Sequence, residues 1–192
     1  MPRTREQFLE MKDERKSSIL KAALVLFSLN KKVSSDEISK KAKCSHGIVY
    51  HYFNNTDQIL ATLLKSPTYV ELHNSLFSNT DGSSYERLES IIKIMIDISK
   101  KDIEKICYLN MLIRDREKNS LFSLLCKIIK EGQASGTLVA GEPAEIVESV
   151  FFLFKGIYLS FLLEKHPDVK VPSIETMMQL IRKSTSFYRQ IL

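Results

Sequence analysis

Glycine and proline are so scarce in this sequence that the chain has few places to turn except between helices. Its 192 residues include six Gly and five Pro. A many-stranded sheet needs a turn roughly every 8 to 12 residues, and these two residues make most such turns. Hydrophobic residues form 44% of the chain and charged residues 27%, enough to fill a core and to cover it. We therefore expect a folded, all-α protein with about nine helices.

The cysteines and the apolar segments indicate the cellular compartment of such a protein. Cys44, Cys107 and Cys126 are far apart and odd in number, so we expect no disulfide framework, no zinc site and a reducing compartment. We interpret each as a small apolar filler rather than a redox sensor. The first sixteen residues are too charged for a signal peptide, and no stretch reaches the roughly 18 apolar residues of a membrane span. We expect a cytoplasmic protein without a membrane partner.

Positive charge is concentrated in the first third of the chain. Residues 1–65 carry twelve Lys or Arg against seven Asp or Glu, whereas residues 66–192 carry sixteen of each. The whole net charge of +5 therefore lies in the first 65 residues. Such an asymmetry suits an anionic polymer, because neutralised phosphates supply most of the non-specific affinity for nucleic acid. An ordinary basic surface is the alternative.

Two helices are expected before residue 44. Apolar residues at helical spacing mark the first helix, which should end near Asn30: Ile19, Ala22, Ala23, Leu26 and Phe27. Ser34 and Glu37 have the spacing of a capping box, in which each side chain bonds the backbone N–H of the other. A second helix of about two turns should therefore start there.

A third helix should follow Ser45, which can cap it, and its residues separate into two faces at the helical period. One face is polar and aromatic without an acid: His46, Gly47, Tyr50, His51 and Asn54. The other is core: Ile48, Val49, Tyr52 and Phe53. Two short helices joined by a tight turn form a helix-turn-helix, whose second helix enters the major groove of DNA. We place this motif at about residues 34–53.

The polar face has the chemistry for DNA. Gly47 would let the backbone approach closely, Ser45 and Tyr50 could donate to phosphates, and His46 or His51 could reach a base edge or a phosphate. Each histidine taken alone is more often a solvated surface residue, and two histidines without a third ligand do not make a metal site.

Residues 19–27 and 37–60 resemble the first three helices of the tetracycline-repressor (TetR) family of bacterial transcriptional regulators. The matching positions include Ser45, Gly47, Tyr50, Phe53 and Leu60. Lys43-Cys44 replaces the usual Gly-Val of the turn, and Thr56 stands where the family usually has a Lys that contacts a phosphate. The DNA-binding residues that we predict on this basis are Ser35, Lys43, Ser45, His46, Gly47, Tyr50, His51 and Thr56.

Residues 67–192 predict a larger helical domain after a DNA-binding domain of residues 1–66. A helix from Pro143 to about Lys165 is apolar almost all round, so it needs more cover than one small domain gives. A last helix should begin at Pro172 and Ser173 and run with Tyr188 and Ile191 on one side. These two helices predict a homodimer interface, and a two-fold dimer would suit a palindromic DNA site. A deeply buried helix inside a monomer is the alternative.

The resemblance implies that this second domain binds a small effector, which weakens DNA binding and makes the protein a ligand-responsive repressor. Residues that could line its pocket are Tyr108, Met111, Arg114, Phe154 and Tyr158, although for each of them an ordinary core or snorkelling role is the more common one. A domain that docks a partner protein instead of a ligand is the alternative. We find no hydrolase elbow, phosphate loop or metalloprotease motif, so we expect no enzyme, cofactor or metal.

Overall fold

The computed structural model describes residues 5–30, 32–78, 80–99, 102–163 and 170–182. The chain divides into two compact units, Met1–Glu71 and Leu72–Leu192. The described residues form ten α-helices, and an isolated antiparallel bridge pairs Leu138 with Arg182. The prediction of an all-α fold is confirmed, with one helix more than the expected nine or so.

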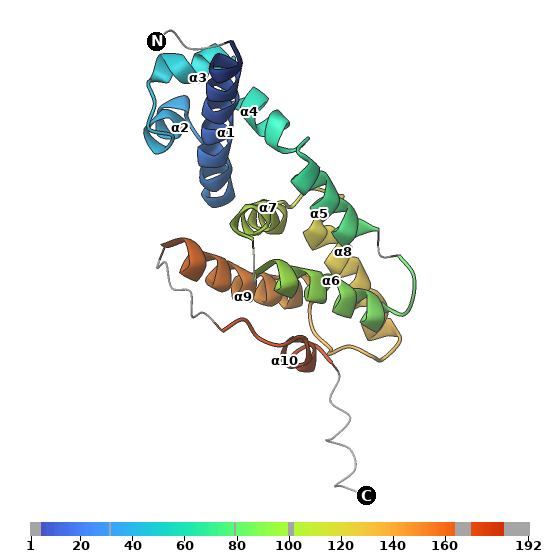
Figure 1. The fold of residues 1–192 in the computed structure, drawn as a ribbon. Helices are drawn as coiled ribbons and strands as arrows, with labels where there is room; N and C mark the ends of the chain where they lie inside the picture. Colours follow the sequence, from blue (N-terminus) through green and yellow to red (C-terminus); the bar gives the residue numbers. More distant parts are fainter. Residues whose placement is uncertain (1–4, 31, 79, 100–101, 164–169, 183–192) are drawn as a thin grey trace, which may run out of the picture. The chain divides into compact units, whose positions relative to one another are not determined.

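The first unit packs three short helices around one long one (Figure 1). α1 (Arg5–Leu29) contacts α2 (Ser35–Lys41) and α4 (Thr56–Leu63), and α2 contacts α3 (His46–Tyr52). The buried side chains of these helices are Ile19, Ala22, Ala23, Leu24, Phe27, Ile38, Val49, Phe53, Ile59 and Leu63. In α1 the predicted stripe is present except that Leu24 is buried and the predicted Leu26 is half-buried. Small Ala22 and Ala23 let the other helices approach α1 closely.

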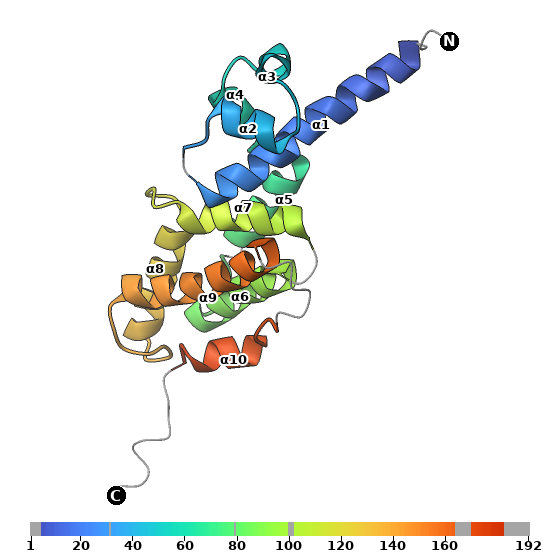
Figure 2. The same ribbon diagram turned by 90° about the vertical axis from the view of Figure 1, so that its left-hand side faces the viewer.

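α1 is longer than its apolar stripe predicts. It begins at Arg5, whereas the first buried side chain among its described residues is Ile19. Figure 2 shows the first half of α1 extending beyond α2, α3 and α4, and the side chains of residues 10–17 are exposed. This half contains no Gly or Pro and is rich in Glu, Lys, Arg and Met, which favour a helix without burial.

The turns of the first unit are fixed by local hydrogen bonds. The capping box predicted at Ser34 and Glu37 is present, and Asn55 caps α4 by accepting from the Gln58 N–H at 2.8 Å. Ser45 holds the N-cap position of α3, but its side chain makes no capping hydrogen bond. The prediction that Ser45 caps this helix through its side chain is therefore wrong. The Ser45 hydroxyl is therefore not bonded to a backbone N–H group of α3.

The second unit is built around α6. α5 (Pro67–Phe77) begins in the first unit and ends in the second, so the division falls inside a helix, whereas the sequence analysis placed it at Pro67. α6 (Ser84–Ser99) contacts four helices: α7 (Ile103–Arg114), α8 (Leu121–Ala134), α9 (Pro143–Leu163) and α10 (Ile174–Gln179). Ile91, Ile92 and Met95 of α6 are fully buried, as expected for a central helix.

Polar contacts tie the helices of this unit together. Arg87 on α6 donates to Glu131 on α8 at 2.7 Å. Arg116 donates to Glu148 of α9 at 2.6 Å, and its guanidinium lies 4.5 Å from the ring centre of Phe122. Gly132 on α8 packs against the Leu138 side chain, which would have to move to make room for a Cβ there. None of the three cysteines forms a disulfide, and burial raises the pKa of the Cys126 thiol.

The final helix is shorter than predicted. α10 ends at Gln179, because the chain then turns and the Ile181 carbonyl accepts from the Val139 N–H at 2.9 Å. Ile181 is buried at this bridge, although the predicted helix would run on through it to Tyr188. Tyr188, Ile191 and the predicted helix end at residues 164–169 lie outside the described residues. Within the described part, no helix combines the length and hydropathy needed to cross a membrane.

Candidate nucleic-acid interface

α3 has one buried face and one exposed face, as its periodicity predicts. Val49 and Phe53 are buried, and Ile48 and Tyr52 are half-buried. His46, Gly47 and His51 are exposed, and Tyr50 is 48% exposed although it is a large aromatic residue. A Cβ placed on Gly47 would meet no atom within 4 Å, so packing inside the chain does not require glycine there. The exposed face is therefore open to a partner from outside.

The first turns of α2 and α3 are joined by a hydrogen-bonded cluster. The Ser35 hydroxyl lies 2.9 Å from Nε2 of His46 and 3.2 Å from the hydroxyl of Tyr50. The His46 and Tyr50 rings meet edge to face, with their centres 4.7 Å apart. Three of the predicted DNA-binding residues, from two helices, thus form one contiguous group.

Asp36 also belongs to this cluster, and the sequence analysis missed it. Its Oδ1 lies 3.3 Å from Nε2 of His46, and its side chain is 70% exposed. Read along α3 alone, the polar face has no acid, but the packing of α2 against α3 brings this carboxylate to the edge of that face. No spacing within one helix could reveal a contact between two helices, so the sequence carried no direct signal for it.

The remaining predicted residues surround this cluster. Lys43 is exposed in the turn between α2 and α3 and has a φ of 52°, the left-handed conformation that glycine usually supplies. The turn between α2 and α3 therefore adopts the left-handed conformation with Lys43 in the place where glycine is usual. His51 packs edge to face against Tyr52, with ring centres 5.2 Å apart. Thr56 is half-buried at the first position of α4.

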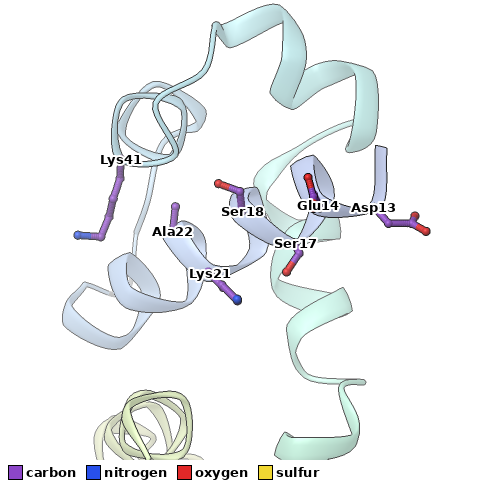
Figure 3. Close-up of a pocket in the computed structure, with 7 residues that line it drawn as sticks. All are labelled: Asp13, Glu14, Ser17, Ser18, Lys21, Ala22 and Lys41. Carbon is purple, nitrogen blue, oxygen red and sulfur yellow. The ribbon is translucent and has the colours of Figure 1, made fainter. Parts of the chain in front are cut away.

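A separate hollow lies on α1 and α2, with a volume of about 810 Å³. Figure 3 shows six of its lining residues on α1 and Lys41 on α2: Asp13, Glu14, Ser17, Ser18, Lys21 and Ala22. Its lining mixes acids, cations and hydroxyls and contains no aromatic side chain, which differs from the mostly apolar lining of small-molecule sites. None of the residues predicted to bind an effector lies there.

The residues predicted to bind an effector lie on two helices in contact, α7 and α9. Tyr108, Phe154 and Tyr158 are buried, and Met111 and Arg114 are half-buried. Burial lowers the pKa of the Arg114 guanidinium, and an electrostatic interaction with Tyr158 opposes that effect. Arg114 is thus a cation held partly away from water at the end of α7 and coupled to α9.

α9 leaves large apolar side chains uncovered within its own chain. Phe152 is 65% exposed, and Leu153 and Leu159 are each 41% exposed. Gly156 lies one turn from Phe152 on the same face, and a Cβ there would meet nothing within 4 Å. Clustered apolar exposure of this kind marks an interaction surface more often than isolated exposed residues do.

Residues 19–63 match the family model described as bacterial regulatory proteins, tetR family. Among solved structures, the chain is similar to NalD of Pseudomonas aeruginosa, described as the secondary repressor of the MexAB-OprM multidrug efflux pump. The TM-score is 0.52 at 18% identity, over 90% of this chain and 98% of NalD. No curated protein sequence matches the chain.

Two further solved structures carry ligands. The complex of SmeT with triclosan gives a TM-score of 0.51 at 15% identity, over 90% of this chain and 93% of SmeT. AibR in complex with isovaleryl coenzyme A and operator DNA gives 0.54 at 14% identity, over 86% of this chain and 94% of AibR. At such identities these likenesses establish the fold.

Proposed function

Since this chain belongs to the tetR family of bacterial regulatory proteins, we propose that it is a homodimeric repressor that binds a palindromic operator and is released by a small-molecule effector. The observation that carries the proposal is the exposed face of α3. A helix that exposes two histidines, a half-exposed tyrosine and a glycine that packing does not require is suited to contact with a duplex.

The residues on and around this face divide by the DNA groups they suit. Tyr50, Ser45 and Lys43 are donors placed to contact phosphates, and Gly47 allows the backbone of α3 to approach. His46 and His51 are the candidates for base edges, while Ser35 and Thr56 are the first residues of α2 and α4, where their hydroxyl groups could donate to phosphates. We assign DNA binding to an N-terminal domain of about residues 1–66. We assign effector binding and dimerisation to residues 67–192.

A homodimer would cover the exposed face of α9. Phe152, Leu153 and Leu159 offer apolar area to a second copy, and Gly156 would let two α9 helices cross closely. Two copies related by a two-fold axis would present two α3 helices to successive major grooves, about 34 Å apart. We propose the last two described helices, α9 and α10, as the dimer interface.

The effector site is proposed between α7 and α9. Arg114 is a partly buried cation beside Tyr158, and Tyr108, Phe154 and Met111 supply apolar and aromatic surface. This chemistry suits an amphipathic molecule with an anionic group. The triclosan and isovaleryl coenzyme A complexes of SmeT and AibR support a small ligand, as opposed to a docked protein, in a chain of this fold.

Selection of bound sites from a random duplex pool tests the proposal. We expect a palindrome with half-sites one helical turn apart, bound by a dimer in sedimentation equilibrium. A thermal-shift screen of apolar anions should then raise the melting temperature of the wild type and not of Arg114→Met. Equal enrichment of all duplexes would contradict the repressor function. A co-purifying protein with no ligand response would favour the docking alternative.

A further inference from the structure

We propose that Asp36 and Ser35 are specificity-determining positioning residues, which hold His46 so that it reads a base amine and does not bind a phosphate. This inference rests on the proposed DNA-binding function and concerns how sequence is read. Neither side chain needs to touch a base. Both act through the orientation and proton placement of His46 at the start of α3.

The geometry fixes which edge of the His46 ring faces α2. Nε2 lies 2.9 Å from the Ser35 hydroxyl and 3.3 Å from Oδ1 of Asp36, so this nitrogen is engaged from α2 on two sides. The Tyr50 ring packs against the edge of the same imidazole. With these three neighbours in contact, the ring is restrained, while 48% of the side chain stays exposed.

The chemistry of these neighbours places the ring proton. A lone pair on Nε2 would face the Asp36 carboxylate oxygen at 3.3 Å and be repelled by it, so we place the ring proton on Nε2. Ser35 can accept from the same N–H and use its single proton to donate to the Tyr50 oxygen, which leaves the Tyr50 proton available for a phosphate. In the neutral ring, Nδ1 is then a bare acceptor.

A bare acceptor discriminates between the two kinds of DNA contact. Phosphate oxygens only accept, so a neutral His46 in this tautomer has nothing to offer them. Base edges in the major groove include the amino donors of adenine and cytosine, which an acceptor nitrogen can bind. Residues in the first turn of a recognition helix are the ones that contact base edges. His46 therefore contributes sequence specificity, and Tyr50 contributes affinity.

The charge of Asp36 gives the proposal a distinctive signature. An exposed carboxylate beside the DNA-binding face repels phosphate, so removing it should strengthen binding to any duplex. Removing it should also release the His46 ring and weaken discrimination between duplexes. A residue needed only for folding would lower both kinds of binding together. Opposite changes in non-specific affinity and in specificity are thus expected from a positioning role alone.

Asp57 provides a matched control. Asp36 and Asp57 are each the second residue of a short helix, α2 and α4, and both are exposed acids in the first turn. Asp57→Ala therefore removes the same charge and the same favourable interaction with a helix N-terminus, but it lies in a helix other than the two that meet at His46. Asp36→Asn is the conservative variant, because its amide oxygen can still accept from Nε2.

The experiment uses the full chain and the duplex selected from the random pool, with a scrambled duplex of equal length as the non-specific probe. Affinities are measured at several salt concentrations, after thermal melting has shown each variant to be folded. We expect Asp36→Ala and Ser35→Ala to lower the ratio of specific to non-specific affinity about tenfold, the loss of one base contact. His46→Ala should do the same without changing the salt slope. Asp36→Asn and Asp57→Ala should leave the ratio of specific to non-specific affinity unchanged.

Three results would overturn the inference. One is an unchanged affinity ratio in Asp36→Ala while the wild type still selects a palindrome, which leaves the proposed function intact. Another is a salt slope that falls by about 0.9 in His46→Ala, the signature of one lost phosphate contact. A third is an equal loss of ratio in Asp57→Ala. If the wild type bound no duplex preferentially, the proposed function would fail as well.

Discussion

Ser34 and Glu37 satisfy each other at the start of α2. The backbone N–H and the hydroxyl of Ser34 both donate to Oε2 of Glu37, at 2.8 and 2.6 Å, and the Glu37 N–H donates to the Ser34 hydroxyl at 3.3 Å. The side-chain and then the backbone hydrogen bond of Ser34 lower the pKa of Glu37 below its ordinary value of 4.5. This pair fixes the first turn of the helix that carries Ser35 and Asp36.

The capping box should make stability depend on pH. A carboxylate whose pKa is lowered by folding stabilises the folded state above its ordinary pKa, and that contribution is lost as pH falls through the lowered value. We expect Glu37→Ala to unfold at lower urea concentration than the wild type at pH 7, with the difference narrowing below 4.5. An exposed glutamate outside any capping box is the control: Glu10→Ala should show no such narrowing. A difference independent of pH would contradict the capping role.

Replacing Lys43 with glycine should stabilise the first unit. Lys43 holds a φ of 52°, a conformation that costs an L-residue more than it costs glycine. We expect Lys43→Gly to raise the free energy of unfolding by at most about 1 kcal/mol. The gain is reduced because glycine loses more backbone entropy on folding than lysine does. Lys41→Gly, in the last turn of α2, should instead lower stability by about 1 kcal/mol. Equal losses in the two variants would show that Lys43 is not in the left-handed conformation.

Gly47 should prove dispensable for folding and necessary for DNA. A Cβ at this position has open space around it, and alanine favours a helix over glycine by roughly 0.5 to 1 kcal/mol. We expect Gly47→Ala to melt at or above the wild-type temperature and to bind the selected duplex at least tenfold more weakly, because the added methyl group lies against DNA. In contrast, Gly132→Ala should melt lower, because its Cβ meets Leu138. Wild-type affinity in Gly47→Ala would contradict a close approach of the α3 backbone to DNA at this position.

A charge on the open face of α9 should dissociate the dimer. Phe152 is 65% exposed within its chain, and a carboxylate there would have to be desolvated in a two-fold interface. We expect Phe152→Glu to sediment as a monomer at concentrations where the wild type is a dimer. Ile103 on α7 is 61% exposed, so Ile103→Glu is the matched control and should stay dimeric. Dimers of Phe152→Glu would place the interface elsewhere.

The parts of the fold that depend on neighbours in sequence could be predicted, and those that depend on packing between helices could not. The capping box at Ser34 and the two faces of α3 follow from spacing within a few residues, and both predictions are confirmed. The contact between Asp36 and His46 arises only because α2 packs on α3, so the periodicity within either helix could not predict it. The same reason explains α10, which ends where Ile181 pairs with Val139.

The early start of α1 was missed for a different reason. The search for helices relied on apolar stripes, and the described side chains before Ser18 are exposed. Intrinsic propensity, summed over residues 5–17, would have indicated the helix. The functional roles of the thirteen predicted site residues stay predictions, since burial and geometry identify a surface without identifying what binds it.

The central claim is that the exposed face of α3 reads DNA, and the binding of Tyr50→Ala to the selected duplex tests it most directly. Tyr50 is 48% exposed, so its loss should lower the melting temperature only slightly and leave the variant folded. We predict that fluorescence anisotropy will give an affinity lower by tenfold or more and a salt slope smaller in magnitude by about 0.9, one phosphate contact. A folded Tyr50→Ala variant with wild-type affinity and an unchanged slope would contradict the account.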